Sequence, residues 1–306
     1  MTDAKAAAPS LPAVSPAGRA NNLPLALLWM AGALLSFSMI AIAGREAGRG
    51  TDTVQIMFYR AAFGLPIIIA VALATGAART TFTMTRLPLH GLRASIHFIA
   101  QFSWLYALGL ITLAELFAIE FTAPLWVALT APLFLAEKLT PVRLAAGVLG
   151  FIGVLVIAQP GSTTFGLGTA LGMVAAIGFA ANMITTKLLT RTETTLCVLF
   201  HMMWIQLVIA AVLIGFKPHV ADTTTMLWVA AVAVLGLTAH FSLTQAFAHA
   251  DAINVAPMDF LRLPLIIAAG ALIYGEAVSP WLMLGAAIVI AANLINMFGE
   301  RIWRRT

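Results

Sequence analysis

The stretch "ELFAIEFTAPLWV", from Glu115 to Val127, sets one carboxylate, Glu120, among phenylalanine, isoleucine, leucine and tryptophan. If the stretch crosses a membrane, an uncompensated charge at its centre costs roughly 2.5–3.5 kcal/mol on insertion scales. Ionisable residues in such positions face the interior of a helix bundle or a water-filled cavity. The role of Glu120 therefore depends on where the chain lies.

The composition is that of a membrane protein. Apolar residues make up 61% of the 306 residues and charged residues 9%, against roughly 45–50% and about 25% in soluble domains. Long apolar runs recur along the chain, and each approaches the ~20 residues that a helix needs to cross a bilayer. The alternating strands of a membrane β-barrel do not occur. We expect an all-α integral membrane protein in a lipid bilayer.

Ten transmembrane helices are expected. Their ranges are 24–44, 54–75, 88–108, 114–135, 142–159, 166–190, 196–216, 226–248, 252–274 and 281–298. The connections are too short to hold a soluble domain. Residues 1–22, rich in Ala, Pro and Ser, predict a disordered cytoplasmic tail, and residues 301–306 predict a basic cytoplasmic tail.

The basic residues predict the orientation in the membrane. With the N-terminus in the cytoplasm, 12 of the 17 lysines and arginines lie inside, 3 lie outside (Arg45, Arg49 and Lys217), and Arg60 and Arg262 lie within spans. This asymmetry follows the positive-inside rule and supports an even number of crossings, with both termini cytoplasmic, in the inner (plasma) membrane. The formal charge of +5 then needs no nucleic acid partner to explain it.

The second half of the chain repeats the first. An offset of 139 residues aligns Phe102-Ser103 with Phe241-Ser242, Ala107 with Ala246, Glu120-Phe121 with Asp259-Phe260, Glu137 with Glu276, and Pro141 with Pro280. Residues 23–160 and 161–300 are the two expected repeats. Because each holds five helices, an odd number, the second enters the membrane from the opposite side. Inverted repeats of this kind are typical of secondary transporters, which bind their solute near the membrane midplane.

These features carry a family resemblance. Basic residues end the first helix of each repeat (Arg45 and Lys187), "FYR" spans Phe58–Arg60, and an acidic corner occurs as "EKLTP" (Glu137–Pro141) and "EAVSP" (Glu276–Pro280). Together they resemble the EamA-type branch of the drug/metabolite transporter superfamily. The resemblance implies a ten-helix solute carrier, in a superfamily whose members move amino acids, other metabolites, nucleotide-sugars and drugs. The second repeat departs from it, with "FHM" where the first has "FYR".

Charged residues within the spans are the first candidates for the solute site. Glu120 and its repeat mate Asp259 approach the membrane centre from opposite leaflets, where they suit a cationic amine or a coupling proton. Arg262 follows Asp259 by three residues on one helix face and is equally suited to a structural ion pair. Arg60, which follows Tyr59, is suited to three roles: snorkelling, pairing with Glu120, or holding a solute carboxylate.

Uncharged polar and aromatic residues form a second group of candidates. His97, Gln101 and Trp104 share one face of the third span, and His201 with Trp204 shares one face of the seventh. His240 is the repeat mate of Gln101, and Asn182 lies in the sixth span. Each residue is suited either to solute contact or to hydrogen bonds that join helices.

The leading expectation is a secondary transporter that moves a small polar metabolite, an amino acid or a related solute, by alternating access. Export is favoured by the resemblance, and uptake of a cofactor-type solute such as riboflavin or S-adenosylmethionine is the alternative. Proton coupling through Glu120, Asp259 or His97 is one energy source that fits these residues. No ATP-binding motif occurs, and an intramembrane enzyme is disfavoured because no nucleophile motif occurs. The chain is expected to act as a monomer or homodimer.

Neither a metal nor a cofactor is expected. The histidines lack His-Glu-x-x-His spacing, and Cys-x-x-Cys is absent. A single cysteine, Cys197, excludes an intrachain disulfide framework. The glycines of "GVLGFIGVL" (147–155) predict close helix packing or a dimer surface.

Overall fold

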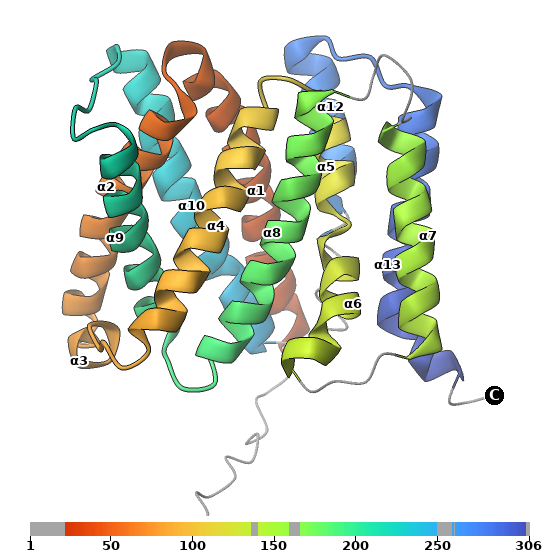
Figure 1. Cartoon of the computed structure of the whole chain (residues 1–306), viewed down its shortest axis with the longest axis horizontal. Helices are drawn as coiled ribbons and strands as arrows, with labels where there is room; N and C mark the ends of the chain where they lie inside the picture. Colours follow the sequence, from red (N-terminus) through yellow and green to blue (C-terminus); the bar gives the residue numbers. More distant parts are fainter. Residues whose placement is uncertain (1–21, 136–139, 159–165, 250–258, 260, 304–306) are drawn as a thin grey trace, which may run out of the picture.

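The computed structural model describes residues 22–135, 140–158, 166–249, 259 and 261–303, and in these residues the regular structure is helical (Figure 1). The helices are α1 Leu23–Gly50, α2 Thr53–Ala74, α3 Ala78–Thr81, α4 Leu87–Ala107, α5 Leu113–Glu120, α6 Ala123–Leu135, α7 Pro141–Ala158, α8 Leu167–Leu189, α9 Thr195–Leu213, α10 Thr223–His249, α12 Arg262–Tyr274 and α13 Pro280–Trp303. Three expected features lie outside the described residues: the N-terminal tail, the acidic corner at Glu137, and residues 252–258 and 260 of the expected ninth span. Residues 301–303 continue α13 rather than forming a tail.

The helices pack mainly in four pairs: α1 with α10, α4 with α8, α2 with α9, and α7 with α13. Figure 1 shows α2 and α9 at one end of the bundle and α7 and α13 at the other. The short helices α5 and α6 lie between, where α5 contacts α8 and α12. This arrangement brings α5 and α12, the helices that carry Glu120 and Arg262, into the centre of the molecule.

Helix starts are fixed by local hydrogen bonds that the sequence encodes. The side chains of Asp52, Thr112 and Thr194 accept hydrogen bonds from the backbone N–H three residues later, at 3.0, 3.1 and 3.2 Å. These bonds satisfy N–H groups that have no partner within the helix. Gly275, with φ 64°, ends α12 in the left-handed conformation, which glycine adopts without steric cost.

Membrane character is supported by helix length and composition. Within the described part of the chain, six helical segments are long and apolar enough to cross a bilayer, and α7, α12 and α13 contain shorter apolar segments. The helix α4 is not among them and carries the polar residues His90, Arg93, His97 and Gln101. Large apolar side chains are exposed on the outside of the bundle, among them Leu28, Leu133 and Leu272. Such an outer surface suits lipid rather than water.

The expected fourth span is not one continuous helix. It breaks between Glu120, the last residue of α5, and Ala123, the first residue of α6. Pro124 has no N–H to donate to the carbonyl of Glu120, four residues earlier. The Phe121 carbonyl instead accepts a hydrogen bond of 2.7 Å from Asn293 Nδ2 in α13. Glu120 therefore lies at a helix end rather than on the side of a continuous helix.

The first helix is longer than expected. The predicted span stops at residue 44, whereas α1 continues through Arg45 to Gly50. Arg45 donates hydrogen bonds to the carbonyls of Leu108 at 2.6 Å and Ile111 at 2.5 Å. A charged side chain that is satisfied in this way does not require the helix to end.

The glycine-rich stretch of α7 packs against neighbouring helices of the same chain. A Cβ at Gly150 would lie 1.9 Å from Leu125 Cδ1 in α6, and one at Gly153 would lie 3.0 Å from the Gly285 carbonyl oxygen in α13. These distances leave no room for a side chain. The predicted packing role is therefore confirmed at these two positions.

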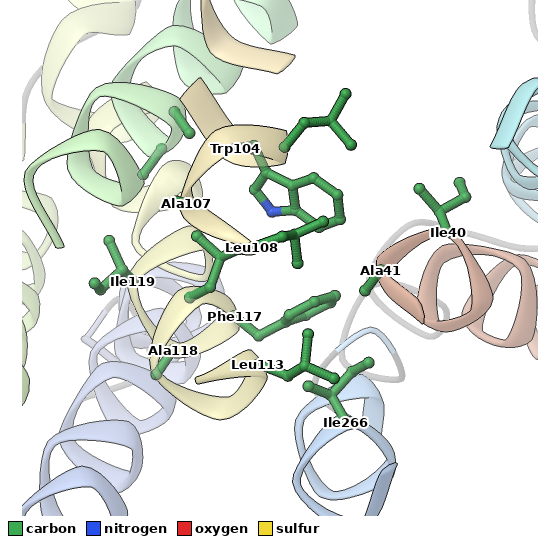
Figure 2. Close-up of a cluster of buried hydrophobic side chains, with 14 of the residues drawn as sticks. Ile40, Ala41, Trp104, Ala107, Leu108, Leu113, Phe117, Ala118, Ile119 and Ile266 are labelled. Carbon is green, nitrogen blue, oxygen red and sulfur yellow. The ribbon is translucent and has the colours of Figure 1, made fainter. Parts of the chain in front are cut away.

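The buried core surrounds α5. Figure 2 shows Phe117 among Trp104, Leu113 and Ile266, which come from α4, α5 and α12. Phe117 is fully buried, and its ring meets the Trp104 indole edge to face with centroids 5.9 Å apart. This apolar layer lies beside Glu120 and fixes the position of α5 between the two halves of the chain.

Candidate functional site

A cavity of about 480 Å³ lies in the centre of the bundle. Small-molecule sites typically measure about 300–1,000 Å³. Its wall includes nine of the residues singled out in the sequence: Arg60, His97, Gln101, Trp104, Glu120, Asn182, His240, Asp259 and Arg262. The structure thus gathers polar residues from α2, α4, α5, α8, α10 and α12 around one space.

Glu120 is held by two neighbours across the cavity wall. Trp104 Nε1 donates a hydrogen bond of 2.7 Å to Glu120 Oε2, and Arg262 Nη2 lies 3.4 Å from Glu120 Oε1. Arg262 also lies 2.9 Å from Asp259 Oδ2, so the expected Asp259–Arg262 pair is present and extends to Glu120. One cation therefore sits between two carboxylates, and the described group carries a net negative charge when both acids are ionised.

Aromatic rings surround the Arg262 guanidinium. Its Cζ atom lies 5.0 Å from the ring centre of Phe37, 5.3 Å from Phe117 and 5.2 Å from Phe121. Cation–π contacts of this kind favour a fixed guanidinium in a site that excludes water. Phe37, Phe121 and Phe179 also line the cavity, which gives it flat apolar surfaces beside the charges.

Arg60 does not pair with Glu120. It is 6% exposed and donates a hydrogen bond to Gln206 Oε1. Gln206 Nε2 in turn donates to the Ala94 carbonyl at 3.1 Å and to His97 Nδ1 at 3.0 Å. The chain Arg60–Gln206–His97 joins α2, α9 and α4 on one side of the cavity, and Arg60 lies too deep to snorkel to the surface.

Several buried polar atoms near the cavity have no hydrogen-bond partner among the described residues. They are Asn182 Oδ1, Asn293 Oδ1, Arg60 Nε and Arg262 Nε. Buried polar atoms in proteins are nearly always hydrogen-bonded, to protein or to a bound molecule. The cavity wall therefore contains polar groups whose hydrogen-bonding capacity the described residues leave unused.

Three of the sequence candidates do not line this cavity. Tyr59 packs between Phe58 and Phe63, with ring centres 5.1 and 6.0 Å away. His201 stacks on His90 with ring centres 4.1 Å apart. Trp204 lies beside His201, and its Nε1 atom has no partner among the described residues. The shared helix face of His201 and Trp204 points into a helix contact.

Other cavity residues were not singled out in the sequence. Asn293 and Asn296 of α13 and Phe179 of α8 line the cavity, and Gln206 orients Arg60 and His97 behind it. Gln206 and Asn293 are polar amides within apolar runs, so the criterion that selected Asn182 would have found them. Phe179 carries no comparable signal, because apolar residues occur on every face of such helices.

A second hollow, of about 850 Å³, lies at the opposite end of α4 from α3. Its wall includes Arg45, Arg49, Asp52, Tyr274 and Glu276. Arg45 and Glu276 form an ion pair there, with both side chains 12% exposed. The central cavity is lined instead by Met30, in the first half of α1, and by Leu243 and Asn296, in the last halves of α10 and α13. Figure 1 shows the C-terminal end of α13 at the same end of the bundle as α3.

Comparison with known proteins places the chain among transporters. The sequence pattern of the EamA-like transporter family matches residues 24–159 and again residues 166–298. A riboflavin transporter of Rhizobium johnstonii is 32% identical over 290 residues, which cover 89% of this chain and 91% of that protein. An S-adenosylmethionine uptake transporter of Rickettsia bellii is 26% identical over 89% of this chain and 93% of its own length.

More distant relatives share the same architecture. A pseudopaline exporter of Pseudomonas aeruginosa is 23% identical over 85% of this chain and 91% of that protein. One solved crystal structure superposes with a TM-score of 0.65 at 18% identity, covering 93% of this chain and all of that one. The resemblance inferred from the sequence is confirmed: the chain is a member of the EamA-like transporter family, within the drug/metabolite transporter superfamily.

Proposed function

We propose that the protein is a secondary transporter that takes up a flat heteroaromatic solute, with riboflavin as the leading candidate, by alternating access. The observation that carries the proposal is the central cavity, which combines the aromatic faces of Phe37, Trp104 and Phe179 with buried amides. Aromatic walls stack on a planar ring system, while a few fixed polar groups set its orientation. The identity of 32% with a riboflavin transporter supports the same choice.

Alternating access rests on ten helices arranged as two inverted repeats, residues 23–160 and 161–300. The packing of the helices supports this arrangement. Under the sequence alignment α1 corresponds to α8 and α4 to α10, so exchange of the halves turns the α1–α10 pair into the α8–α4 pair. The pairs α2–α9 and α7–α13 map onto themselves. The break after Glu120 fits the discontinuous helices that many carriers place at their midplane site.

The site residues have distinct proposed roles. Trp104 and the phenylalanines stack on the ring system, Asn182 and Gln101 bind its polar edge, and Arg60 and Arg262 bind carbonyl oxygens. Glu120 and Asp259 hold Arg262 in place and are the candidates for proton coupling. Tyr59, His201 and Trp204 are outside this proposed set because they pack elsewhere.

Amino-acid export, the leading expectation from the sequence, is the second candidate. Arg60 and Arg262 would bind a carboxylate and Glu120 an ammonium group. It has less support, because the relatives described above are named for riboflavin, S-adenosylmethionine and pseudopaline. The direction of transport also differs among these relatives, so uptake belongs to the proposal together with riboflavin.

Counterflow in proteoliposomes tests the proposal. Vesicles loaded with unlabelled riboflavin should accumulate labelled riboflavin faster than vesicles loaded with buffer, and Trp104→Phe should slow this exchange. Trp281→Phe is the matched control, since Trp281 is 57% exposed on α13. Counterflow with an amino acid and not with riboflavin would favour the second candidate, and absence of counterflow with either class would refute both.

The proposal also includes the orientation of the chain in the membrane. We place both termini in the cytoplasm and the chain in the inner membrane, as the distribution of basic residues favours. The central cavity then extends toward the cytoplasm, and the Arg45–Glu276 pair closes the outer end. Labelling of a cysteine introduced at His219 from the outside, and at Arg86 only after permeabilisation, in a Cys197→Ser background, would support this orientation.

A further inference from the structure

A cluster of buried ligand-type side chains lies outside the cavity, where α9 begins beside α4. His90, Cys197 and His201 are all at most 2% exposed, and their ligand atoms lie within 4.8 Å of one another. His90 comes from the first turn of α4, whereas Cys197 and His201 lie four residues apart on α9. The solute pathway described above does not use these residues.

The two distances from the thiol are close to those of a metal centre. Cys197 Sγ lies 3.7 Å from His201 Nδ1 and 3.9 Å from His90 Nε2. In a tetrahedral Zn²⁺ site, with bonds of about 2.3 Å to sulfur and about 2.0 Å to nitrogen, neighbouring ligand atoms lie about 3.5 Å apart. The rings of His90 and His201 stack with centres 4.1 Å apart, so one ring has to turn out of the stack for both nitrogens to bind one ion.

A candidate fourth donor lies beside Cys197. Glu193 Oε2 is 3.4 Å from Cys197 Sγ, in the turn between α8 and α9. Glu193 is partly exposed, and Met84, whose Sδ lies 3.4 Å from His201 Nε2, is 55% exposed. The three buried ligands thus lie behind two residues that reach the surface.

The His90 ring has room to change its orientation. It presents Nε2 to the thiol, 3.9 Å from Cys197 Sγ. Its Nδ1 atom is buried and has no hydrogen-bond partner among the described residues. A ligating histidine is commonly fixed by a hydrogen bond from its second nitrogen. No described residue fixes the His90 ring in this way, so the ring can turn toward an ion.

We propose that His90, Cys197, His201 and Glu193 form a binding site for a borderline-soft divalent cation, with Zn²⁺ as its best-fitting ion. A thiolate, two imidazoles and one carboxylate are the ligand types that Zn²⁺ prefers. The absence of a sequential ligand motif, on which the expectation of no metal rested, does not bear on this site, because its ligands come from two helices and a turn.

Binding changes the protonation of the cluster in a defined way. The Cys197 thiol loses its proton to water as sulfur bonds to the ion, because the thiolate is the ligand. His201 Nδ1 gives up its 3.0 Å hydrogen bond to the Cys197 carbonyl and binds the metal, and the ring proton moves from Nδ1 to Nε2, which faces Met84. One bond from α4 and two from α9 then tie these helices together at the end of the bundle that holds α3.

Metal binding to the purified full-length protein in detergent tests the site. After chelator treatment, the protein should bind about one Zn²⁺ per chain by elemental analysis and should show a thiolate charge-transfer band with Co²⁺ as the probe. Because Cys197 is the single cysteine of the chain, that band reports this site alone. One bound ion without a thiolate band, or no stoichiometric binding, would overturn the proposal.

Variants separate the cluster from other histidines. Cys197→Ser should abolish the Co²⁺ band, and His90→Asn and His201→Asn should each weaken Zn²⁺ binding at least about tenfold, since even outer-shell changes cost about 10–100-fold. His219→Asn, in an exposed loop, is the matched control and should bind like the wild type. Unchanged affinity in Cys197→Ser would contradict the assignment. The Co²⁺ spectrum of the wild type decides the question even if a variant fails to fold.

Discussion

Arg45 of α1 forms an ion pair with Glu276, 231 positions later in the chain. Arg45 also donates to two backbone carbonyls after α4, while Glu276 Oε2 accepts a hydrogen bond of 2.9 Å from Leu113 N at the start of α5. A carboxylate at a helix N-terminus is favoured by the helix dipole. The pair therefore ties together α1, α5 and the segments that flank them.

Removing either partner of this pair should destabilise the protein. We expect Arg45→Met or Glu276→Gln to lower the free energy of unfolding by about 3 kcal/mol, because each leaves a largely buried charge or several backbone groups without a partner. The double variant should lose less than the sum of the two single losses, which shows direct coupling. Unfolding in mixed micelles monitored by circular dichroism measures these differences.

Arg49→Met is the matched control for that experiment. Arg49 pairs with Glu46 at 2.8 Å, but its side chain is 63% exposed, and exposed pairs contribute at most about 1 kcal/mol. A loss in Arg49→Met as large as that in Arg45→Met would contradict the importance given to burial of the Arg45–Glu276 pair.

The hydrogen bond between Trp104 and Glu120 should matter for transport more than for folding. Trp104→Phe keeps an aromatic ring against Phe117 but removes the Nε1 donor that holds Glu120. We expect transport to fall about tenfold, which corresponds to 1.4 kcal/mol. Thermal stability should change little, because Glu120 keeps its contact with Arg262 and lines the cavity, where water can replace the lost donor. Equal transport by the wild type and Trp104→Phe would exclude this hydrogen bond from the transport cycle.

Glu120→Gln tests proton coupling. The amide keeps an acceptor for Trp104 but cannot exchange a proton, and it leaves Arg262 paired with Asp259. We expect the variant to retain counterflow yet to lose the pH dependence of net uptake. Asp259→Asn in parallel distinguishes the two carboxylates. A pH profile that is unchanged in Glu120→Gln would remove Glu120 from the coupling pathway.

The sequence predicts which residues lie within the membrane-spanning helices and which helix faces point inward. It predicts less well which residues these side chains contact. A polar residue in an apolar span is expected to face inward. This expectation holds for Glu120, His97, Asn182 and Asp259, which line one cavity. The expectation does not identify the neighbouring helix. His201 meets the same condition as His97, yet it satisfies it against His90 and Cys197, because α9 packs on α4 there.

The helix break after Glu120 is a second feature that depends on a contact the sequence does not reveal. Pro124 predicts an interruption, but the position of the break depends on Asn293, 172 positions away in the chain. A contact of this length has no local signal. The break also changes the interpretation of Glu120, whose position at a helix end directs it toward Trp104 and Arg262.

Asn293 should be required to stabilise that break. Asn293→Ala leaves the Phe121 carbonyl without its 2.7 Å hydrogen bond in a buried position. One intramolecular hydrogen bond contributes about 0.5–1.5 kcal/mol, so we expect the free energy of unfolding to fall by this amount. Asn296→Ala, one turn later on α13, is the control and should be nearly neutral for stability. Similar losses in both variants would indicate a general effect of shortening α13 side chains.

The ionisation of the Glu193 carboxyl should make the stability of the fold depend on pH. Partial burial raises the pKa of its carboxyl, but hydrogen bonds from Thr85 at 2.8 Å, Cys197 at 3.4 Å and Thr83 at 3.1 Å outweigh this effect, so the pKa lies below its ordinary value. A lowered pKa in the folded state means that ionised Glu193 stabilises the fold above the unfolded-state pKa of about 4.3. That contribution is lost as the pH falls through the folded-state pKa.

The comparison of wild type with Glu193→Gln measures this contribution, with chelator present so that no metal takes part. The variant should melt at a lower temperature than the wild type at pH 7, and the difference should shrink as the pH falls below about 4. Arg191→Gln, an exposed change in the same turn, controls for the loss of a charge. A difference in melting temperature that grows toward acid pH would mean that the carboxylate destabilises the turn, opposite to the sign expected from its hydrogen bonds.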